Sequence, residues 1–442
     1  MNKILTKIWD GYNNFASRLG LQTDNMTKHG TYQWDPLVNE RMTLEYMYSG
    51  SWIAKAAIEM PAHDMTRVGV TLQGLPVKDN KLLQHAILDL NIWPSLCECI
   101  KWARLYGGCL GYIRIDGQDP STPLDFSTIG VGQFQGIDPM SRWQITPSIA
   151  HMVEEGPEYG LPQFYTSVFD NSLYSKPFTI HHSRVIRFIG IEVPWFQRIA
   201  LLFWGQSLLV NIRPQIQAYD SIKTMIDQLA NKAHLRTLRV KGMRDLLATG
   251  GEDGEEELMK YVTAMRMTQS SEDITVIDGD DEFGAIPYNF AGLKDVMEIC
   301  GEQIAAATGI PQSKLFGRQA DGLGASHTGD NINYLANLES ERENRLRRPI
   351  GKILDVLSMS ILGKPLPEDF SFTFDSLDQM DDKEVAELGS KFTDTIIKTY
   401  QAGLITSEEA RKELSELSLM TKLFDDLAAD IEHITGEEDA TD

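Results

Sequence analysis

Apolar side chains that recur every three or four residues predict two central helices in this chain. One apolar stripe spans residues 214–233 and contains Ile216, Tyr219, Ile222, Ile226 and Leu229. Because proline suits the first turn of a helix, we expect this helix to begin at Pro214 and to form a rod about 30 Å long. A second stripe spans residues 293–308, and Gly309 followed by Pro311 is a typical helix stop signal.

Residues 235–290, which separate the two rods, have the pattern of a small α/β module. Strand-like runs at 235–242 and 273–278 flank a helical run at 255–267. A rod with one apolar face needs a partner to cover that face. Two rods around an insertion therefore predict a helical hairpin that is stable mainly when it packs in a bundle or ring.

A third and longer helix is predicted over residues 330–362. Its apolar positions are Ile332, Leu335, Leu338, Leu346, Ile350, Ile353, Leu354, Leu357 and Ile361. Pro349 lies inside it and removes one backbone hydrogen bond, so we expect a kink between residues 345 and 349 and an end at Gly363. Residues 381–442 then have the pattern of two or three short acidic helices, at 385–400, 407–417 and 419–434.

The first 205 residues predict a mixed α+β domain. Helical stretches at 40–60 and 81–106 precede strand-like runs at 111–115 and 184–190, and glycine and proline are frequent between them. The first 20 residues combine apolar positions at helical spacing with charges throughout, so we do not expect a signal peptide.

Acidic side chains gather in two parts of the chain. The 442 residues carry a formal charge of -22; residues 242–290 contain 3 basic and 12 acidic side chains, and residues 381–442 contain 6 and 17. This balance argues against a protein that grips nucleic acid over a broad basic surface. No run approaches the roughly 20 apolar residues of a membrane span, so we expect a soluble protein without a membrane partner.

Residues 310–331, IPQSKLFGRQADGLGASHTGDN, form a glycine-rich stretch with two cations, Lys314 and Arg318. The stretch does not match a phosphate-binding loop. Gly317 and Gly322 have the glycine spacing of a Walker loop, but Leu323 and Gly324 stand where the lysine and the hydroxyl residue are needed. A dinucleotide fingerprint is also excluded, because the preceding element is a helix and the fold requires a strand there. We therefore expect no nucleotide cofactor.

Other candidate catalytic and metal-binding motifs are incomplete. His181 and His182 have no acidic or cysteine partner at ligand spacing, so we interpret them, with His63 and His151, as loop histidines. The acidic run 278–282 lacks the spacing of a calcium loop. The four cysteines, Cys97, Cys99, Cys109 and Cys300, are interpreted as packing residues. These observations predict a protein that is not an enzyme and binds neither metal nor cofactor.

Four motifs in a fixed order resemble the portal (head-to-tail connector) proteins of tailed bacteriophages. They are ARLYGGCLGYIRIDG at 103–117, IHHSRVIRFIG at 180–190, FWGQSLL and QAYDSIK at 203–223, and the run from ATGIPQSKLFG to RRPIGKILDVL at 307–357. The last is the most specific, because a helix, an IPxxxLFG turn, a glycine-rich loop and a long helix with a late Arg-Pro step occur together.

The resemblance implies an α+β, mainly helical portal fold. Its parts would be an N-terminal arm and wing (1–205), a two-helix stem (206–234 and 291–309), an inserted α/β clip (235–290), a tunnel loop (310–329), a long kinked wing helix with a following strand (330–380) and a helical crown (381–442). It also implies a ring, typically of twelve subunits, at one capsid vertex, through which double-stranded DNA is packaged and ejected. The implied partners are the terminase motor, the major capsid and scaffold proteins, and head-tail adaptor proteins. The implied location is the virion, with assembly in the host cytoplasm.

The resemblance also suggests which residues carry the function. In the tunnel loop we expect Lys314, Arg318, Gln319 and Asp321 to face the channel, although a surface or intersubunit ion pair explains both cations equally well. Ser326, Thr328 or Asp330 would cap the long helix. The hinge and kink positions are expected at Gly309, Pro311, Gly317, Gly322, Gly324 and Pro349. The clip would dock a partner through Glu252, Asp253, Glu255, Glu256 and Glu257.

Two other classes of protein remain open. One is a minor capsid or head-tail adaptor protein without a channel. The other is a relative of a phage-encoded phosphodiesterase, for which a pair of His-x-Thr motifs would be diagnostic. The stretch from His234 to Thr237 has the spacing His-x-x-Thr and does not match this motif.

Overall fold

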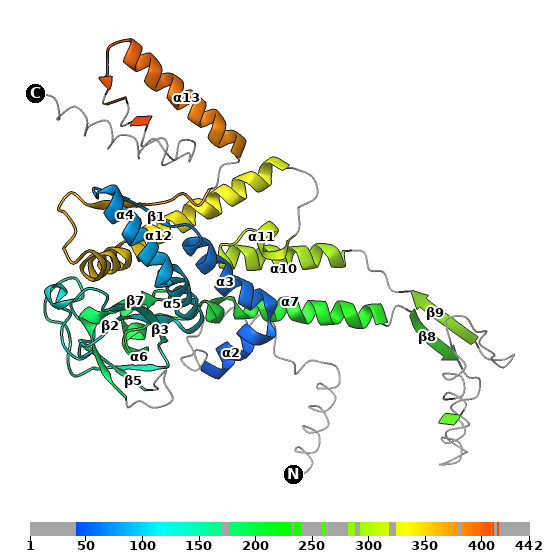
Figure 1. The fold of residues 1–442 in the computed structure, drawn as a ribbon. Coiled ribbons are helices and arrows are strands. Elements are labelled where there is room, and N and C mark those ends of the chain that lie inside the picture. The colour runs from blue at the N-terminus through cyan, green and yellow to red at the C-terminus, as the bar shows by residue number, and fades with distance from the viewer. Residues whose placement is uncertain are drawn as a thin grey trace, which may run out of the picture.

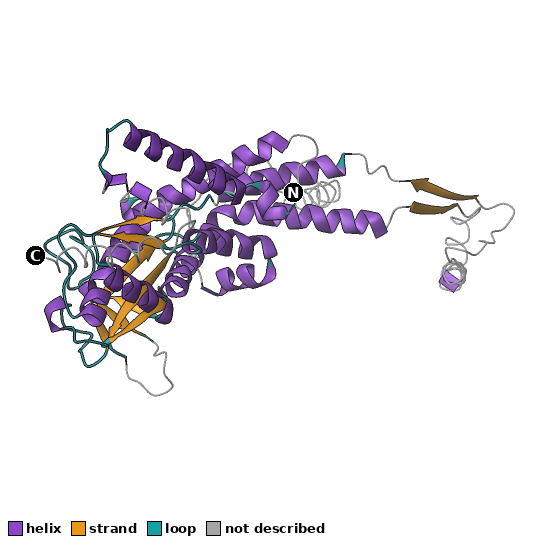
Figure 2. Cartoon of the chain, turned by 45° about the horizontal axis from the view of Figure 1, so that its top comes forward, coloured by secondary structure: helices purple, strands orange, loops and turns teal. Residues whose placement is uncertain are grey.

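The computed structural model describes residues 41–168, 177–231, 234–239, 282–287, 292–317, 324–378 and 382–407, and also residues 259, 260, 263, 409, 410, 413 and 414 (Figure 1). A helix-rich body contains small antiparallel sheets, and two helices project from it towards a two-stranded ribbon (Figures 1 and 2). The expected α+β, mainly helical class is confirmed.

Four helices form the N-terminal part of the body: α2 (Arg41–Gly50), α3 (Trp52–Thr66), α4 (Val77–Asp89) and α5 (Ile92–Tyr106). Each of the two helical stretches expected here is thus a pair of helices. Ser51 starts α3, because its side chain accepts a hydrogen bond from the amide of Ala54 at 3.4 Å. Asn91 separates α4 from α5 in a left-handed conformation (φ 50°) that asparagine tolerates well.

Two three-stranded antiparallel sheets follow these helices. In the first, β2 (Gly108–Ile115) lies between β3 (Phe134–Ser141) and β7 (Val185–Ile189), which confirms the strands expected at 111–115 and 184–190. The second contains β4 (Ile145–Pro147), β5 (Phe164–Ser167) and β6 (Thr179–His181). Three short helices complete this region: η3 (Phe126–Thr128), η4 (His182–Arg184) and α6 (Trp195–Ala200).

The projecting pair, which we call the stem hairpin, consists of α7 (Leu208–Asn231) and α10 (Leu293–Thr308). The strands β8 (His234–Arg239) and β9 (Glu282–Pro287) pair antiparallel beyond its far end (Figure 1). The bounds of α10 agree with the prediction. The predicted start of the first rod at Pro214 is wrong, because α7 begins at Leu208 and Pro214 lies inside it. Burial explains the difference, since the added turn packs Leu209 and Ile212 in the core and Ser207 accepts a hydrogen bond from the amide of Leu209 at 3.1 Å.

The sequence pattern predicted one of the two strands in the ribbon beyond the stem hairpin. The strand-like run at 235–242 overlaps β8, whereas β9 was not predicted and begins at Glu282, the last residue of the acidic run 278–282. The other expected strand, at 273–278, lies outside the described residues.

The remaining elements are α11 (Gln312–Phe316), α12 (Gly324–Leu362), β10 (Ser371–Phe374) and α13 (Asp382–Gln401). Helix α12 begins six residues before the predicted start, so the expected capping at Ser326, Thr328 or Asp330 is wrong. No proline stands between Gly324 and Asp330, and helical propensity alone is too weak to stop a long helix there. The helix continues through Pro349 and ends, as expected, before Gly363, which has φ 66°.

The main core joins parts of the chain that are far apart in sequence. It brings together fully buried side chains from α3, from α5, from the first turns of α7 and from the second half of α12, including Ile58, Leu96, Leu209 and Leu354. Strand β10 pairs with β1 (Val70–Gln73), so that Leu72 faces Phe372 across about three hundred residues of chain. A smaller core surrounds Trp204 and Tyr165 between the two sheets.

Candidate functional site

The predicted site residues fall partly inside the described chain. Lys314, Gly309, Pro311 and Gly317 lie in the described segment around α11, Gly324 is the first residue of α12, and Pro349 lies inside α12. Arg318, Gln319, Asp321 and Gly322 lie outside the described residues, as do the clip residues Glu252, Asp253, Glu255, Glu256 and Glu257. The site that can be built is therefore the base of the glycine-rich loop. We call residues 317–323, between α11 and α12, the crossover loop.

A tight turn leads from the stem hairpin into α11. Gly309 closes α10 in a left-handed conformation (φ 69°), which a residue without Cβ adopts at little cost. Pro311 is the N-cap of α11, and Gly317 ends α11 with φ 65°. Ile310, which lies between Gly309 and Pro311, is buried, so the turn packs against the body. The two glycines and the proline therefore occupy positions that these residue types favour.

Lys314 forms an ion pair within its own subunit. Its Nζ lies 2.5 Å from Oδ2 of Asp64 on α3, and it lies 4.8 Å from the ring centroid of Tyr334 on α12. The Tyr334 hydroxyl donates a hydrogen bond of 2.7 Å to the same Oδ2 atom. Asp64 thus holds one residue from each side of the crossover loop. We call Asp64, Lys314 and Tyr334 the clamp.

The clamp is mostly shielded from solvent. The side chains of Asp64 and Lys314 are 13% and 30% exposed, and Tyr334 is 4% exposed. Burial and the hydrogen bond to Asp64 raise the pKa of Tyr334 well above its usual range, so its hydroxyl remains protonated and donates at any physiological pH. Charge-assisted hydrogen bonds in such a shielded place are stronger than the same bonds on an open surface.

Aromatic contacts fix α11 beside the clamp. Phe316 packs edge-on against Trp52 of α3, with ring centroids 5.5 Å apart, and lies 5.7 Å from the ring of Tyr219 on α7. A Cβ on Gly301 of α10 would lie 3.1 Å from the side-chain amide nitrogen (Nε2) of Gln312, so α11 approaches the stem hairpin closely at this glycine. Helix α11 therefore contacts the body and both stem helices.

Buried arginines support the same region from α5 and α12. Arg104 donates to the carbonyl of Ala57 at 3.0 Å, and burial lowers its pKa while Glu341 acts in the opposite direction. Arg342, 1% exposed, donates to the carbonyls of Asp375 at 2.8 Å and Gly69 at 3.3 Å. Each guanidinium thus ties a helix to a distant segment of backbone.

Asp64 and Tyr334 were not found by sequence reasoning. Asp64 follows His63 in a helix whose other signals concern packing, and Tyr334 stands next to the predicted apolar stripe of α12. Asp64 belongs to none of the motifs, and Tyr334 lies inside the motif run at 307–357 without a role assigned to it. Lys314 was found, but its partner lies 250 residues away in the chain, and no local pattern identifies such a partner.

The histidines and cysteines have structural partners. His182 lies 2.7 Å from a carboxylate oxygen of Glu158, and His181 contacts the hydroxyl of Ser183 at 2.8 Å. Cys97 lies 3.5 Å from Nδ1 of His63, and all four cysteines are free thiols. Among the described residues no group of three or more His, Cys, Asp or Glu side chains is placed to hold a metal ion. No helix in the described part of the chain is long and apolar enough to span a bilayer.

The fold is similar to that of a chain from the neck of a gene transfer agent particle. A chain in the neck of an empty GTA (gene transfer agent) particle, computed with C6 symmetry, superposes with a TM-score of 0.52 at 15% identity, over 87% of this chain and 95% of that chain. A family model described as phage portal protein matches residues 42–398. The chain therefore belongs to the phage portal protein family.

Three curated relatives match most of the chain. A protein named anti-CBASS protein Acb1 from Sphingomonas paeninsulae is 26% identical over 94% of this chain and 66% of its own length. A second protein of that name, from Caulobacter sp., is 25% identical over 86% of this chain and 61% of its own length. An uncharacterized protein of Haemophilus influenzae is 24% identical over 94% of this chain and 92% of its own length. The chain thus spans less than two thirds of the length of the two relatives named Acb1.

Proposed function

We propose that this chain forms a ring at one vertex of a phage capsid, and that double-stranded DNA is packaged and ejected through the channel of that ring. The observation that carries the proposal is the stem hairpin, which projects from the body and extends towards a terminal ribbon (Figure 2). The portal family membership and the likeness to a neck chain support the same assignment. Twelve subunits is the number that the resemblance implies.

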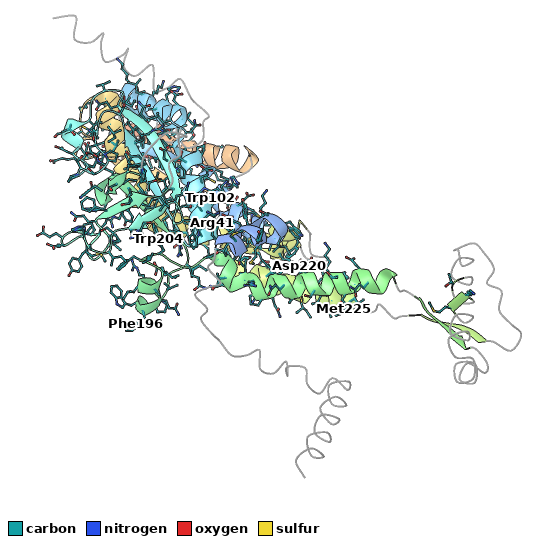
Figure 3. All side chains as sticks on the ribbon, turned by 90° about the horizontal axis from the view of Figure 1, so that it is seen from below. Arg41, Trp102, Phe196, Trp204, Asp220 and Met225 are labelled. Carbon is teal, nitrogen blue, oxygen red and sulfur yellow. The ribbon has the colours of Figure 1, made fainter. Side chains whose placement is uncertain are left out.

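Exposed apolar side chains support an assembly in which neighbours cover the stem hairpin. Met225 of α7 is 56% exposed, and Val296 and Ile299 of α10 are 44% and 52% exposed. Asp220 and Met225 lie along α7, on the part of the helix that projects from the body (Figure 3). In a ring each subunit meets a neighbour on both sides, so both stem helices would gain a partner.

The arrangement at the crossover loop leaves Arg318 as the stronger candidate for contact with DNA. Lys314 already pairs with Asp64, so its charge is less available to phosphates. A channel through which DNA slides needs few cations, because tight phosphate contacts would retain the duplex. We propose that Arg318, with Gln319 and Asp321, faces the channel, and that the acidic residues from Glu252 to Glu257 dock the packaging motor and later the neck proteins.

Imaging of the purified chain tests the ring. Mass photometry is expected to give a particle of about twelve times the 49.7 kDa subunit mass, and negative-stain averages are expected to show a ring with a central hole. A stable monomer at micromolar concentration would contradict the proposal and favour an adaptor protein.

Phage complementation tests the channel residue. Arg318→Ala is expected to leave ring assembly unchanged while it alters the amount of DNA that is packaged or retained. Arg348→Ala, which removes an exposed arginine from α12, serves as the matched control. Equal DNA content in the two variants and the wild type would exclude Arg318 from the channel role.

We further propose that the chain is not an enzyme. Portal proteins act as structural components, and the family match covers most of this chain. A phosphodiesterase assay with cyclic dinucleotides tests this proposal. Turnover of a cyclic dinucleotide by the purified chain would overturn it.

A further inference from the structure

We propose that Asp64 is the positioning residue of the crossover loop, and that one of its carboxylate oxygens sets where the loop leaves and rejoins the body. The proposal rests on the proposed portal function only for the role of the crossover loop in a channel, since the clamp itself lies inside one subunit. The two contacts of Oδ2 come from opposite sides of the loop: Lys314 in α11 precedes it, and Tyr334 in α12 follows it.

A single atom therefore ties three elements together. The contacts of Oδ2 with Lys314 Nζ and the Tyr334 hydroxyl measure 2.5 Å and 2.7 Å, and the ammonium also lies 4.8 Å from the Tyr334 ring centroid. The ammonium of Lys314, the carboxylate of Asp64 and the side chain of Tyr334 thus contact each other pairwise. Loss of one partner weakens the hold on the other two, because a shielded carboxylate without its cation is poorly solvated.

The two sides of the loop are held differently. Helix α11 has a second attachment, because Leu315 is buried and Phe316 packs against Trp52 and Tyr219. On the α12 side, Tyr334 and Leu335 are the first buried residues among the described side chains of the helix, and the described residues from Asp330 to Asn333 are exposed. Tyr334 is accordingly where α12 is first fastened to the body, and its hydroxyl reaches Asp64.

This geometry predicts which part of the chain responds when the clamp is broken. Asp64→Asn keeps the shape of the side chain but removes the charge that attracts Lys314. Tyr334→Phe removes one hydrogen bond and keeps the ring. Both changes are expected to loosen α11 and the first turns of α12, whereas the sheet around β2 lies in another part of the body and is expected to keep its protection.

The matched control is a second lysine–aspartate pair in the same chain. Nζ of Lys364 lies 2.6 Å from Oδ2 of Asp79 on α4, and neither residue belongs to α11 or α12. Lys364→Met therefore removes the same kind of interaction without touching the crossover loop. Lys314→Met removes the cation of the clamp, and Lys314→Arg restores it.

Hydrogen exchange of the full chain tests the proposal. Asp64→Asn and Lys314→Met are expected to speed amide exchange in α11 and the first turns of α12 by about tenfold or more, with β2 unchanged. Lys314→Arg is expected to retain protection, and Lys364→Met is expected to have no effect on these amides. Unchanged exchange in α11 in both clamp variants would overturn the proposal, and so would an equal increase throughout the body.

Two further measurements separate this proposal from the portal function. If Asp64→Asn does not fold, Tyr334→Phe and Lys314→Met are combined, and additive effects on α11 exchange in the double variant would show that no shared clamp exists. Because the clamp lies within one subunit, exchange can be read even if the wild-type chain is a monomer. A monomer with protected α11 would reject the ring and keep the clamp, whereas a ring with unprotected α11 would reject the clamp alone.

Discussion

The indole of Trp204 lies directly against the backbone of Gly108. A Cβ built on Gly108 would lie 2.2 Å from Cε3 of Trp204, a distance that no side chain can occupy. Gly108 begins β2, and Trp204 lies in the smaller core between the two sheets. The sequence motifs that contain YGG and FWG therefore meet in space, and the packed position of Trp204 requires a glycine at position 108.

Gly108→Ala is expected to destabilise the fold by about 3 kcal/mol or more, because the added methyl group forces Trp204 out of its packed position. Thermal or denaturant unfolding of the variant measures the effect. Gly50→Ala is the control, since nothing lies within 4 Å of a Cβ at that position at the end of α2. Equal stability of the two variants would show that Trp204 can move at little cost.

Arg342→Leu is expected to cost about 3 kcal/mol in the free energy of unfolding. Its guanidinium donates to two carbonyls and lies 4.6 Å from the ring of Phe374, so it joins α12 to the β1 and β10 pair. Buried acceptors that lose their donor carry a desolvation cost. Arg342→Lys is expected to rescue the loss only partly, because one ammonium cannot reproduce the fork of the guanidinium. Denaturant unfolding measures all three proteins, and full rescue by lysine would contradict the argument.

Acid is expected to destabilise the body through His181. Burial lowers the pKa of His181 to about 4 from 6.5, and the positive charges of His182, Arg184 and Lys352 act in the same direction, while Glu158 opposes them. The unfolded chain then binds more protons than the folded chain between these two pH values. Stability therefore falls as pH decreases from about 6.5 to 4.

His181→Gln tests this pH dependence, because glutamine does not titrate. The variant is expected to show a smaller fall in melting temperature between pH 6.5 and pH 4 than the wild type. His85→Gln removes an exposed histidine on α4 and is expected to leave the profile unchanged. A wild-type profile in the His181 variant would assign the acid sensitivity to other groups.

Met225→Glu is expected to weaken ring assembly without unfolding the subunit. The side chain is 56% exposed on α7, and a charge there would be buried against a neighbouring subunit in the proposed ring. Mass photometry at several concentrations is expected to show smaller species, with unchanged circular dichroism. Met225→Leu keeps the apolar surface and is expected to assemble as the wild type does. Normal rings from the glutamate variant would place this face outside the interface.

The sequence by itself determined the elements whose signals are local. The stripe from Leu293 to Thr308, followed by Gly309, is enough to define α10, because helix periodicity and a left-handed glycine depend only on near neighbours. The order of the motifs around the crossover loop was enough to indicate the portal family, which the match over residues 42–398 confirms.

The tertiary structure decided what depends on distant partners. Helix α7 extends back to Leu208 because its first turn is buried in the body, and β10 becomes a strand by pairing with β1 across the chain. Lys314, for which a channel position and an ion pair were both left open, pairs with Asp64, and Tyr334 joins them. Packing and pairing of this kind bring together residues hundreds of positions apart, and no periodicity or spacing along the chain records which carboxylate will face which cation.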